Sequence, residues 1–369
     1  MIPSQVMKSS LEELKNITKV DFCVTDLSGT AVVLTNGAAE PDRSLITGFA
    51  STPVDSQIIG NCYLMKIEED NEPAYVLAAT GESDYTLMVA KIAVSEIQNL
   101  LVAYKEKYDR NNFFQNLLLD NLLLVDIYNR AKKLHIEDKV PRAIIMIEIE
   151  NAAGEAAVEK DNTAQELLSG LYTPQNGDYI TAVDESSVIL IKSVASEDDY
   201  GPVEDAANVA VSMLNTEAML KVHAAYGTIV TELKDLSKSY KEAKMALDVG
   251  KIFYAEKRVS SYNSLGIGRL IYQLPVGLCR QFLREIFGDM DLSELDPGTL
   301  ATINTFFENN LNVSETSRQL FVHRNTLVYR IEKLQKATGL DIRNFDDALT
   351  FKIALMVSSY MKYIDSKEY

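Results

Sequence analysis

Basic side chains gather in one short segment of an otherwise acidic chain. Residues 312–343 contain six Lys or Arg and three Asp or Glu, a local charge of +3, whereas all 369 residues together carry −17. The rest of the chain therefore carries −20, which disfavours contact with nucleic acid or anionic lipid over most of the surface. If this protein binds a polyanion, residues 312–343 are the segment that does so.

Within this segment the spacing predicts two short helices joined by a tight turn. Ser314 is a suitable cap for the first helix, Phe321 and Val322 form the bend, and the second helix begins near Arg324. One face of the second helix is apolar and comprises Leu327, Ile331, Leu334 and Thr338. At about 100° per residue, the opposite face comprises Asn325, Tyr329 and Lys336, flanked by Thr326, Glu332 and Lys333.

A helix divided in this way is suited to recognise duplex DNA. Its apolar back docks on the rest of the domain, and its polar front brings hydrogen-bonding groups to base edges in the major groove. The basic side chains placed to hold phosphates are Arg318, Arg324, Arg330, Lys333 and Lys336. An ordinary amphipathic helix with a hydrated basic face explains the spacing equally well, and this chain has Phe321 where such a bend commonly has glycine.

Catalytic chemistry finds little support in the sequence. The chain has three histidines far apart, His135, His223 and His323. It has three dispersed cysteines, Cys23, Cys62 and Cys279. This pattern provides no triad, zinc site or disulfide framework and favours a reducing cytoplasm, with redox sensing by a thiol as an alternative. Since no G-x-x-x-x-G-K-[ST] loop occurs either, we predict no catalytic residue, metal or cofactor.

Strand and helix signals divide the chain into four segments. Residues 1–83 alternate strands with turns after a helix near residues 11–17, 84–138 are helical, 139–262 alternate strands with helices, and 263–369 are helical, including one helix over 267–290. The expected fold is a multidomain α/β plus all-α protein. It has a GAF- or PAS-like N-terminal sensor, long connecting helices, an α/β middle domain and the helical domain that carries the turn at Phe321.

The connecting segment has a regular apolar spacing that starts at Asp84. Its repeating positions are Leu87, Ala90, Val94, Ile97, Leu101, Tyr104 and Tyr108. Alternating steps of three and four predict the seam of a two-stranded coiled coil and hence a homodimer. The alternative is that the same stripe packs on the N-terminal sheet of its own chain.

The sequence also predicts a cytoplasmic protein without a membrane contact. No run approaches the roughly 20 apolar residues that cross a bilayer. The N-terminal residues lack the basic-then-apolar order of a signal peptide.

The run from Asn312 to Ile342 resembles the C-terminal helix-turn-helix of the CdaR/PucR family of bacterial transcriptional regulators. The words that carry the resemblance are His323-Arg324-Asn325-Thr326-Leu327, Tyr329-Arg330, and Thr338-Gly339 with Asp341; Phe321 also fits the family. Fainter matches around residues 239–247 and 262–266 are similar to the family's middle domain, which is related in fold to GGDEF-type nucleotide cyclases. The resemblance covers about residue 113 onward.

The resemblance implies a ligand-responsive transcription factor of a bacterial metabolic operon that binds double-stranded DNA. It places the DNA contacts on His323, Arg324, Asn325, Thr326, Tyr329 and Arg330. The small-molecule effector is unknown, because family members carry different N-terminal domains. From their position between predicted strands, we take as candidate effector contacts Thr52, Asp55 and Tyr63.

The sequence leaves two other functions as alternatives. The first is a nucleotide cyclase, phosphodiesterase or nucleotide-binding sensor built on the middle domain, but the segment between its strands is Val183-Asp184-Glu185-Ser186-Ser187, without the glycines and aromatic residue of a GGDEF hairpin. The second is a ligand-binding protein without a DNA function, or an RNA-binding antiterminator. RNA-binding proteins display stacking aromatics on a sheet or loop, whereas here Tyr329 stands on a helix.

Overall fold

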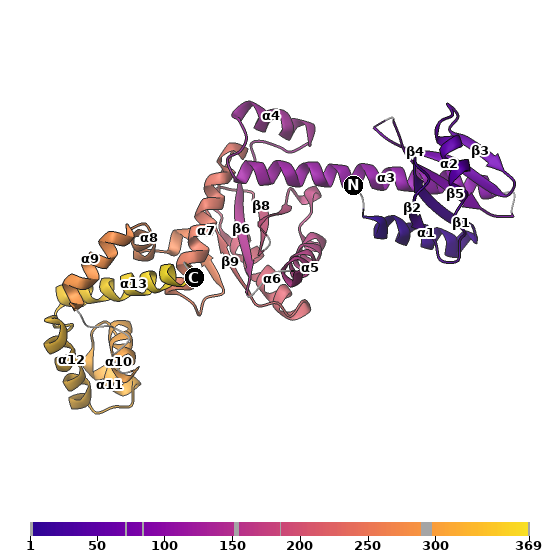
Figure 1. The fold of residues 1–369 in the computed structure, drawn as a ribbon. Coiled ribbons are helices and arrows are strands. Elements are labelled where there is room, and N and C mark those ends of the chain that lie inside the picture. Colours follow the sequence, from indigo (N-terminus) through magenta and orange to yellow (C-terminus); the bar gives the residue numbers. More distant parts are fainter. Residues whose placement is uncertain are drawn as a thin grey trace. The chain divides into compact units, whose positions relative to one another are not determined.

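The computed structural model describes residues 3–70, 72–82, 85–150, 155–184, 186–288 and 297–367. The chain divides into two compact units, one formed by residues 1–114 with 130–136, the other by residues 115–129 with 137–369. The structure contains the α/β regions and the helical C-terminal region that the sequence predicts, in that order along the chain (Figure 1). The predicted start of the connecting helix at Asp84 lies outside the described residues.

The first unit is built on a five-stranded antiparallel sheet of order β2-β1-β5-β4-β3. Its strands are β1 Asp21–Asp26, β2 Ala31–Leu34, β3 Ser56–Ile59, β4 Cys62–Glu69 and β5 Glu72–Thr80. Its helices are α1 Ser4–Thr18, α2 Arg43–Ala50 and the first part of α3 Thr86–Leu118. Successive strand residues alternate between two faces. One face, which includes Phe22 and Leu77, packs on α1 and α3; the other, which includes Cys23 and Leu64, packs on α2.

The alternation of strands with turns that the sequence predicts over residues 1–83 is present, but no sequence pattern indicated α2 or β3. Helix α2 has only eight residues, and the carboxylate of Asp42 caps it by accepting a hydrogen bond from the Ser44 amide at 2.9 Å. Strand β3 is a four-residue edge strand without apolar alternation. Such short elements depend on tertiary packing, so they leave weak periodic signals.

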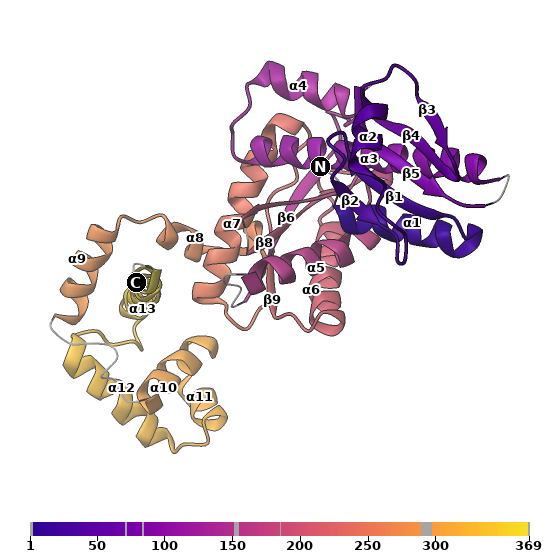
Figure 2. The ribbon, with the colours of Figure 1, turned by 45° about the vertical axis from the view of Figure 1, so that its right-hand side comes forward.

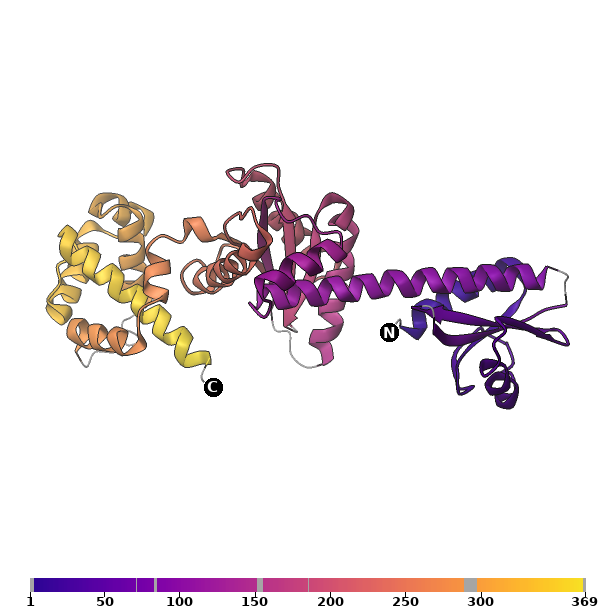
Figure 3. The same cartoon turned by 90° about the horizontal axis from the view of Figure 1, so that it is seen from above.

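The coiled-coil prediction for α3 was wrong. Ala90, Val94, Ile97 and Leu101 are buried in the core between α3 and the N-terminal sheet of the same chain. Figure 3 shows the first half of α3 lying along that sheet. A 3-4 apolar repeat serves a sheet as well as a second helix, because either partner needs one narrow stripe.

Helix α3 also has a composition that bears on membranes. Among the described residues it is one helix long and apolar enough to cross a bilayer, with 39% of the apolar window buried inside the protein. This finding qualifies the expectation that no stretch of the sequence comes near a bilayer span. The packing of α3 on the N-terminal sheet accounts for part of that apolar character.

The second unit contains a mixed sheet of order β10-β9-β6-β8-β7. Its strands are β6 Arg142–Ile149, β7 Tyr179–Asp184, β8 Ser187–Ser193, β9 Val222–Tyr226 and β10 Val259–Ser261. The helices in this part of the chain are α4 Leu124–Lys133, α5 Glu155–Leu171, α6 Gly201–Glu217 and α7 Leu236–Phe253. Helices α5 and α6 pack on one face of the sheet, and α7 packs on the other (Figure 1).

Helix α7 lies unusually close to the sheet. The Ser239 hydroxyl accepts a hydrogen bond from the Ile144 amide at 3.0 Å and donates one to the Thr228 carbonyl at 2.7 Å. A Cβ atom on Gly227 would stand 2.1 Å from the Ser239 carbonyl oxygen, so no other residue fits at that position. The close approach fixes the start of α7 against β6 and β9.

The C-terminal region is helical throughout its described residues. It comprises α8 Ile267–Tyr272, α9 Val276–Phe287, α10 Pro297–Glu308, α11 Val313–Gln319, α12 Arg324–Thr338 and α13 Phe345–Lys367 (Figure 2). The single helix expected over 267–290 is divided in two, because Pro275 cannot continue the hydrogen bonding of a helix; residues 289 and 290 lie outside the described residues. A core between α9, α10, α12 and α13 centres on Phe306 and Phe351.

A buried carboxylate joins the middle domain to the C-terminal helices. Asp248 on α7, 8% exposed, accepts hydrogen bonds from the hydroxyls of Tyr272 on α8, at 2.7 Å, and Tyr363 on α13. Burial, together with the bond to Asp248, raises the pKa of both tyrosines far above the ordinary value. Both hydroxyls therefore stay protonated and act as donors at neutral pH.

Changing Asp248 to Ala is expected to lower the free energy of unfolding of this unit by about 2 kcal/mol, because two buried hydroxyls lose a charged acceptor. Urea unfolding measures the change. The exposed Asp205 on α6 supplies the matched control, and Asp205→Ala should leave the curve unchanged. Equal unfolding curves for the two variants would show that the Asp248 contacts do not hold the helices to the sheet.

Candidate nucleic-acid interface

Helix α11 begins at a side-chain cap. The Asn312 carboxamide oxygen accepts hydrogen bonds from the amides of Ser314 and Glu315, both at 3.1 Å. Asn312 therefore holds the position that the sequence analysis gave to Ser314, which lies inside the first turn. The hydroxyl of buried Thr316 donates to the Asn312 carbonyl at 2.8 Å and keeps the inner face of α11 free of unpaired polar groups.

The turn between α11 and α12 is closed by backbone hydrogen bonds. The Val322 amide donates to the Ser317 carbonyl at 3.0 Å, and the Phe321 amide donates to the Arg318 carbonyl at 3.2 Å. This pair of bonds is a Schellman motif, which places the residue at Phe321 in the left-handed region where glycine is usual. Phe321 has a φ of 55°, and its side chain is 96% exposed.

Helix α12 begins at the cap residue His323. Its Nδ1 atom accepts a hydrogen bond from the Asn325 amide at 3.2 Å. The cap thus fixes the orientation of the imidazole at the start of the helix.

Burial divides α12 as the sequence predicted. Leu327, Ile331 and Leu334 are buried in the core with α10 and α13, and Thr338 is half-buried. The exposed side chains are His323, Arg324, Asn325, Thr326, Tyr329, Glu332, Lys333 and Lys336. Tyr329 is 66% exposed, although an aromatic ring on a globular domain usually finds a partner.

The remaining two basic side chains have partners within the domain. Arg318 pairs with Glu315 at 2.6 Å, but both are well exposed, so the pair contributes little and a phosphate can replace it. The half-buried Arg330 donates to the Gly298 carbonyl at 3.1 Å and to the buried Thr302 hydroxyl at 2.8 Å. Arg330 therefore ties α12 to the first turns of α10.

The three candidate effector residues do not converge. The carbonyl of Thr52 accepts a hydrogen bond from the Lys66 amine, and the carbonyl of Asp55 accepts one from the Lys66 amide at 3.0 Å. Tyr63 packs on the opposite face of the sheet, with α1 and α3. None of the three lines the cavity of about 160 Å³ on the α2 face, which the sequence analysis missed because its lining comes from separate strands and a loop.

In the middle domain, the Asp184 carboxylate holds the turn between β7 and β8. The carboxylate of Asp184 accepts hydrogen bonds from the Ser186 amide at 3.0 Å and the Ser187 hydroxyl at 2.7 Å, while Glu185 lies outside the described residues. Among the side chains that the structure describes, no group of three or more His, Cys, Asp or Glu could hold a metal ion.

Comparisons with known proteins find matches for both the helix-turn-helix region and the middle domain. Residues 299–357 match the PucR C-terminal helix-turn-helix domain, and residues 121–249 match the GGDEF-like domain. The chain is 24% identical to the carbohydrate diacid regulator of Escherichia coli over 78% of this chain and 77% of that protein. It is 26% identical to the purine catabolism regulatory protein of Bacillus subtilis over 37% of this chain and 27% of that protein. It is 24% identical to the Bacillus subtilis DNA-binding transcriptional activator AdeR over 73% of this chain and 65% of that protein.

A helix-turn-helix with a buried back and an exposed polar front, joined to a GGDEF-like domain, defines a DNA-binding transcriptional regulator rather than an enzyme. These matches support a regulator of the CdaR/PucR family. The resemblance of residues 312–342 and the match over residues 299–357 therefore point to the same domain.

The contacts of Arg330 predict a change in stability. Arg330→Ala should lower the free energy of unfolding by about 1–3 kcal/mol, because the buried Thr302 hydroxyl loses its donor and the Gly298 carbonyl loses one of its donors. Lys333→Ala, on the exposed face of the same helix, should change it by less than about 0.5 kcal/mol. Thermal unfolding of both variants distinguishes the roles. If Arg330→Ala is as stable as Lys333→Ala but loses DNA binding, Arg330 is a DNA contact instead.

Proposed function

We propose that this protein is a ligand-responsive regulator of a bacterial metabolic operon that binds its operator as a homodimer through α12. The observation that carries the proposal is the division of α12 between a buried apolar back and an exposed polar front that begins at a capped, well-ordered turn. This arrangement is the one by which a helix-turn-helix places the start of its second helix in the major groove.

The exposed side chains divide by chemistry. His323, Arg324, Asn325 and Thr326 occupy the start of α12, where base edges are within reach, and Tyr329 lies one turn further on. Arginine pairs well with guanine and asparagine with adenine. Lys333, Lys336 and Arg318 suit phosphates on either side. We assign Arg330 the positioning role that its contacts with α10 support.

Phe321 adds an apolar contact that the motif alone does not suggest. A side chain in the left-handed region costs on the order of 1–2 kcal/mol, and the exposed ring recovers none of it by packing within the domain. Phe321 precedes the His323 cap by two residues. We propose that its ring packs on a deoxyribose of the DNA backbone beside the start of α12, which offsets the cost.

Charge and exposed apolar surface support the dimer. One basic segment of +3 on a body of −20 binds DNA weakly alone, whereas a second copy makes the second contact intramolecular and requires a two-fold operator. With its seam buried, α3 still exposes Met88, Ile92 and Val102 on its outer side. Those side chains, rather than the predicted heptad, are the dimer contact that we propose.

The N-terminal unit is the proposed sensor, of GAF- or PAS-like type, and a cytoplasmic location suits a protein that meets both metabolites and DNA. Binding of an effector there would act through α3 on the middle domain and, through Asp248, on α8 and α13. The names of the relatives mention different molecules, so they assign no effector to this chain.

Gel shifts with the DNA upstream of its own gene test the proposal. Arg324→Ala should cost about 1–3 kcal/mol on the preferred site and change the sequence preference. Lys333→Ala should weaken all sequences alike and lower the slope of log affinity against log salt by about one. Deleting one half of the symmetric operator should abolish stable binding.

Two outcomes would contradict the assignment. The first is that neither Arg324→Ala nor Lys333→Ala changes DNA binding although both variants stay folded. The second is that the protein prefers a structured leader RNA of the same gene.

Phe321→Gly separates backbone strain from DNA contact. Glycine relieves the strained φ, so stability should be unchanged or slightly higher, while affinity for every duplex should fall about three- to tenfold with loss of the ring, on the order of 1 kcal/mol. Phe321→Asn, which also tolerates the left-handed region, should behave alike. Unchanged affinity in both variants would make Phe321 a turn residue only.

A further inference from the structure

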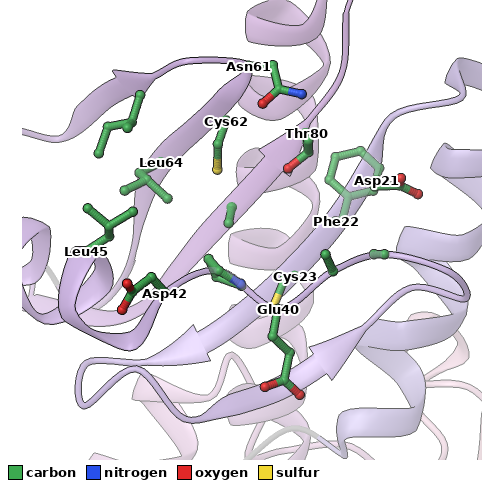
Figure 4. A pocket seen from close by; sticks show the side chains of 15 residues that line it. Asp21, Phe22, Cys23, Glu40, Asp42, Leu45, Asn61, Cys62, Leu64 and Thr80 are labelled. Carbon is green, nitrogen blue, oxygen red and sulfur yellow. The ribbon is translucent and has the colours of Figure 1, made fainter.

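A small cavity opens on the α2 face of the N-terminal sheet. Figure 4 shows it between strands β1, β4 and β5 and the loop that leads into α2. Two rows of paired residues form its floor. The first row is Cys23, Ala78 and Leu64, and the second is Asp21, Thr80 and Cys62. The loop residues 38–42, with Leu45 of α2, cover the floor.

The volume of the cavity limits its occupant. About 160 Å³ is close to the 150 Å³ of an apolar cavity that holds one benzene molecule. A ligand of roughly six to nine non-hydrogen atoms therefore fits. Larger effectors would need the loop over 38–42 to move.

The thiols of Cys23 and Cys62 contribute apolar surface to the cavity. Burial, with a smaller contribution from Glu40, raises the pKa of Cys23 to about 11, and burial raises the pKa of Cys62. Both sulfurs are therefore protonated at neutral pH. Cys23 and Cys62 lie on strands separated by β5, so their Cα atoms are two strand spacings apart, about 10 Å. That distance excludes a disulfide between them and with it a redox switch inside the cavity.

The charges around the cavity are acidic. Three carboxylates line it, those of Asp21, Glu40 and Asp42, and no Lys, Arg or His does. Lys15 already pairs with one of them, Asp21, at 2.5 Å, which leaves Glu40 and Asp42, and Arg43 donates to the Ser28 carbonyl at 2.8 Å. Because Asp42 caps α2, Glu40 is the carboxylate best able to turn towards a ligand. The Thr80 hydroxyl and Asn61 carboxamide add neutral hydrogen-bonding groups.

We propose that this cavity is the effector site and that it takes a small amine, with the apolar body of the ligand on Cys23, Leu64 and Ala78 and its ammonium group at Glu40. Carboxylates are disfavoured, since an anion would meet the carboxylates of Glu40 and Asp42 in a lining that contains no Lys, Arg or His. The effector role rests on the proposed function, whereas the binding preference rests on the cavity alone.

Three probes of nearly equal size and different charge test the preference. Calorimetric titration of the full-length protein at pH 7 with benzylamine, benzyl alcohol and benzoate should give affinities in that order, with benzylamine at least tenfold tighter than benzoate. Benzoate binding as tightly as benzylamine, or no binding by any of the three, overturns the proposal.

Variants locate the binding. Glu40→Gln should weaken benzylamine several-fold without affecting benzyl alcohol, and the matched Glu68→Gln, on an exposed part of β4 outside the cavity, should change neither. Cys62→Phe adds bulk to the floor of the cavity at a half-buried position and should abolish all binding while thermal unfolding stays cooperative. Benzylamine binding that survives Cys62→Phe, or is unchanged by Glu40→Gln, contradicts the site.

Gel shifts on the same preparations separate the two claims. If benzylamine binds in the predicted order and changes operator affinity in wild type but not in Cys62→Phe, both the site and its regulatory role hold. If it binds in that order and leaves DNA affinity unchanged, the binding site stands and the proposed ligand response is wrong.

Discussion

Burial of one face of α12 is the constraint on which the interface depends. Burial of Leu327, Ile331 and Leu334 stabilises the domain by several kcal/mol. The same burial fixes the rotation of α12 about its axis. The His323 cap and the Schellman turn then fix where the helix begins. Because the rotation and the start of α12 are fixed, its polar side chains face solvent together.

Charge complements this geometry. An acidic body disfavours non-specific contact with nucleic acid and leaves the basic segment at residues 312–343 as the one suited to phosphates. The Asp248 contacts serve a different purpose, because they hold α8 and α13 to the middle domain. In the N-terminal unit, one face of the sheet packs on α3 and the other face lines a cavity.

The parts of the fold that could be predicted are those with strong local periodicity. Apolar spacing predicts the alternation of strands and helices over residues 139–262 and the buried Leu327 face of α12. The outward direction of Asn325 and Tyr329 follows from the same spacing. What could not be predicted depends on partners distant in sequence. A 3-4 stripe on α3 does not say whether a sheet or another helix covers it, and no local pattern assembles Cys23, Cys62 and Glu40 around one cavity. The inward contacts of Arg330 likewise need α10, which lies 28–32 residues away in the chain.

Photo-crosslinking tests the central claim most directly. A benzophenone amino acid replaces Tyr329 on α12 in one preparation and Tyr108 on α3 in another, two tyrosines that are each 66% exposed. On irradiation with operator DNA, the account predicts crosslinks from position 329 and none from position 108. Crosslinks from position 108, with none from position 329, would show that the exposed face of α12 does not meet the duplex.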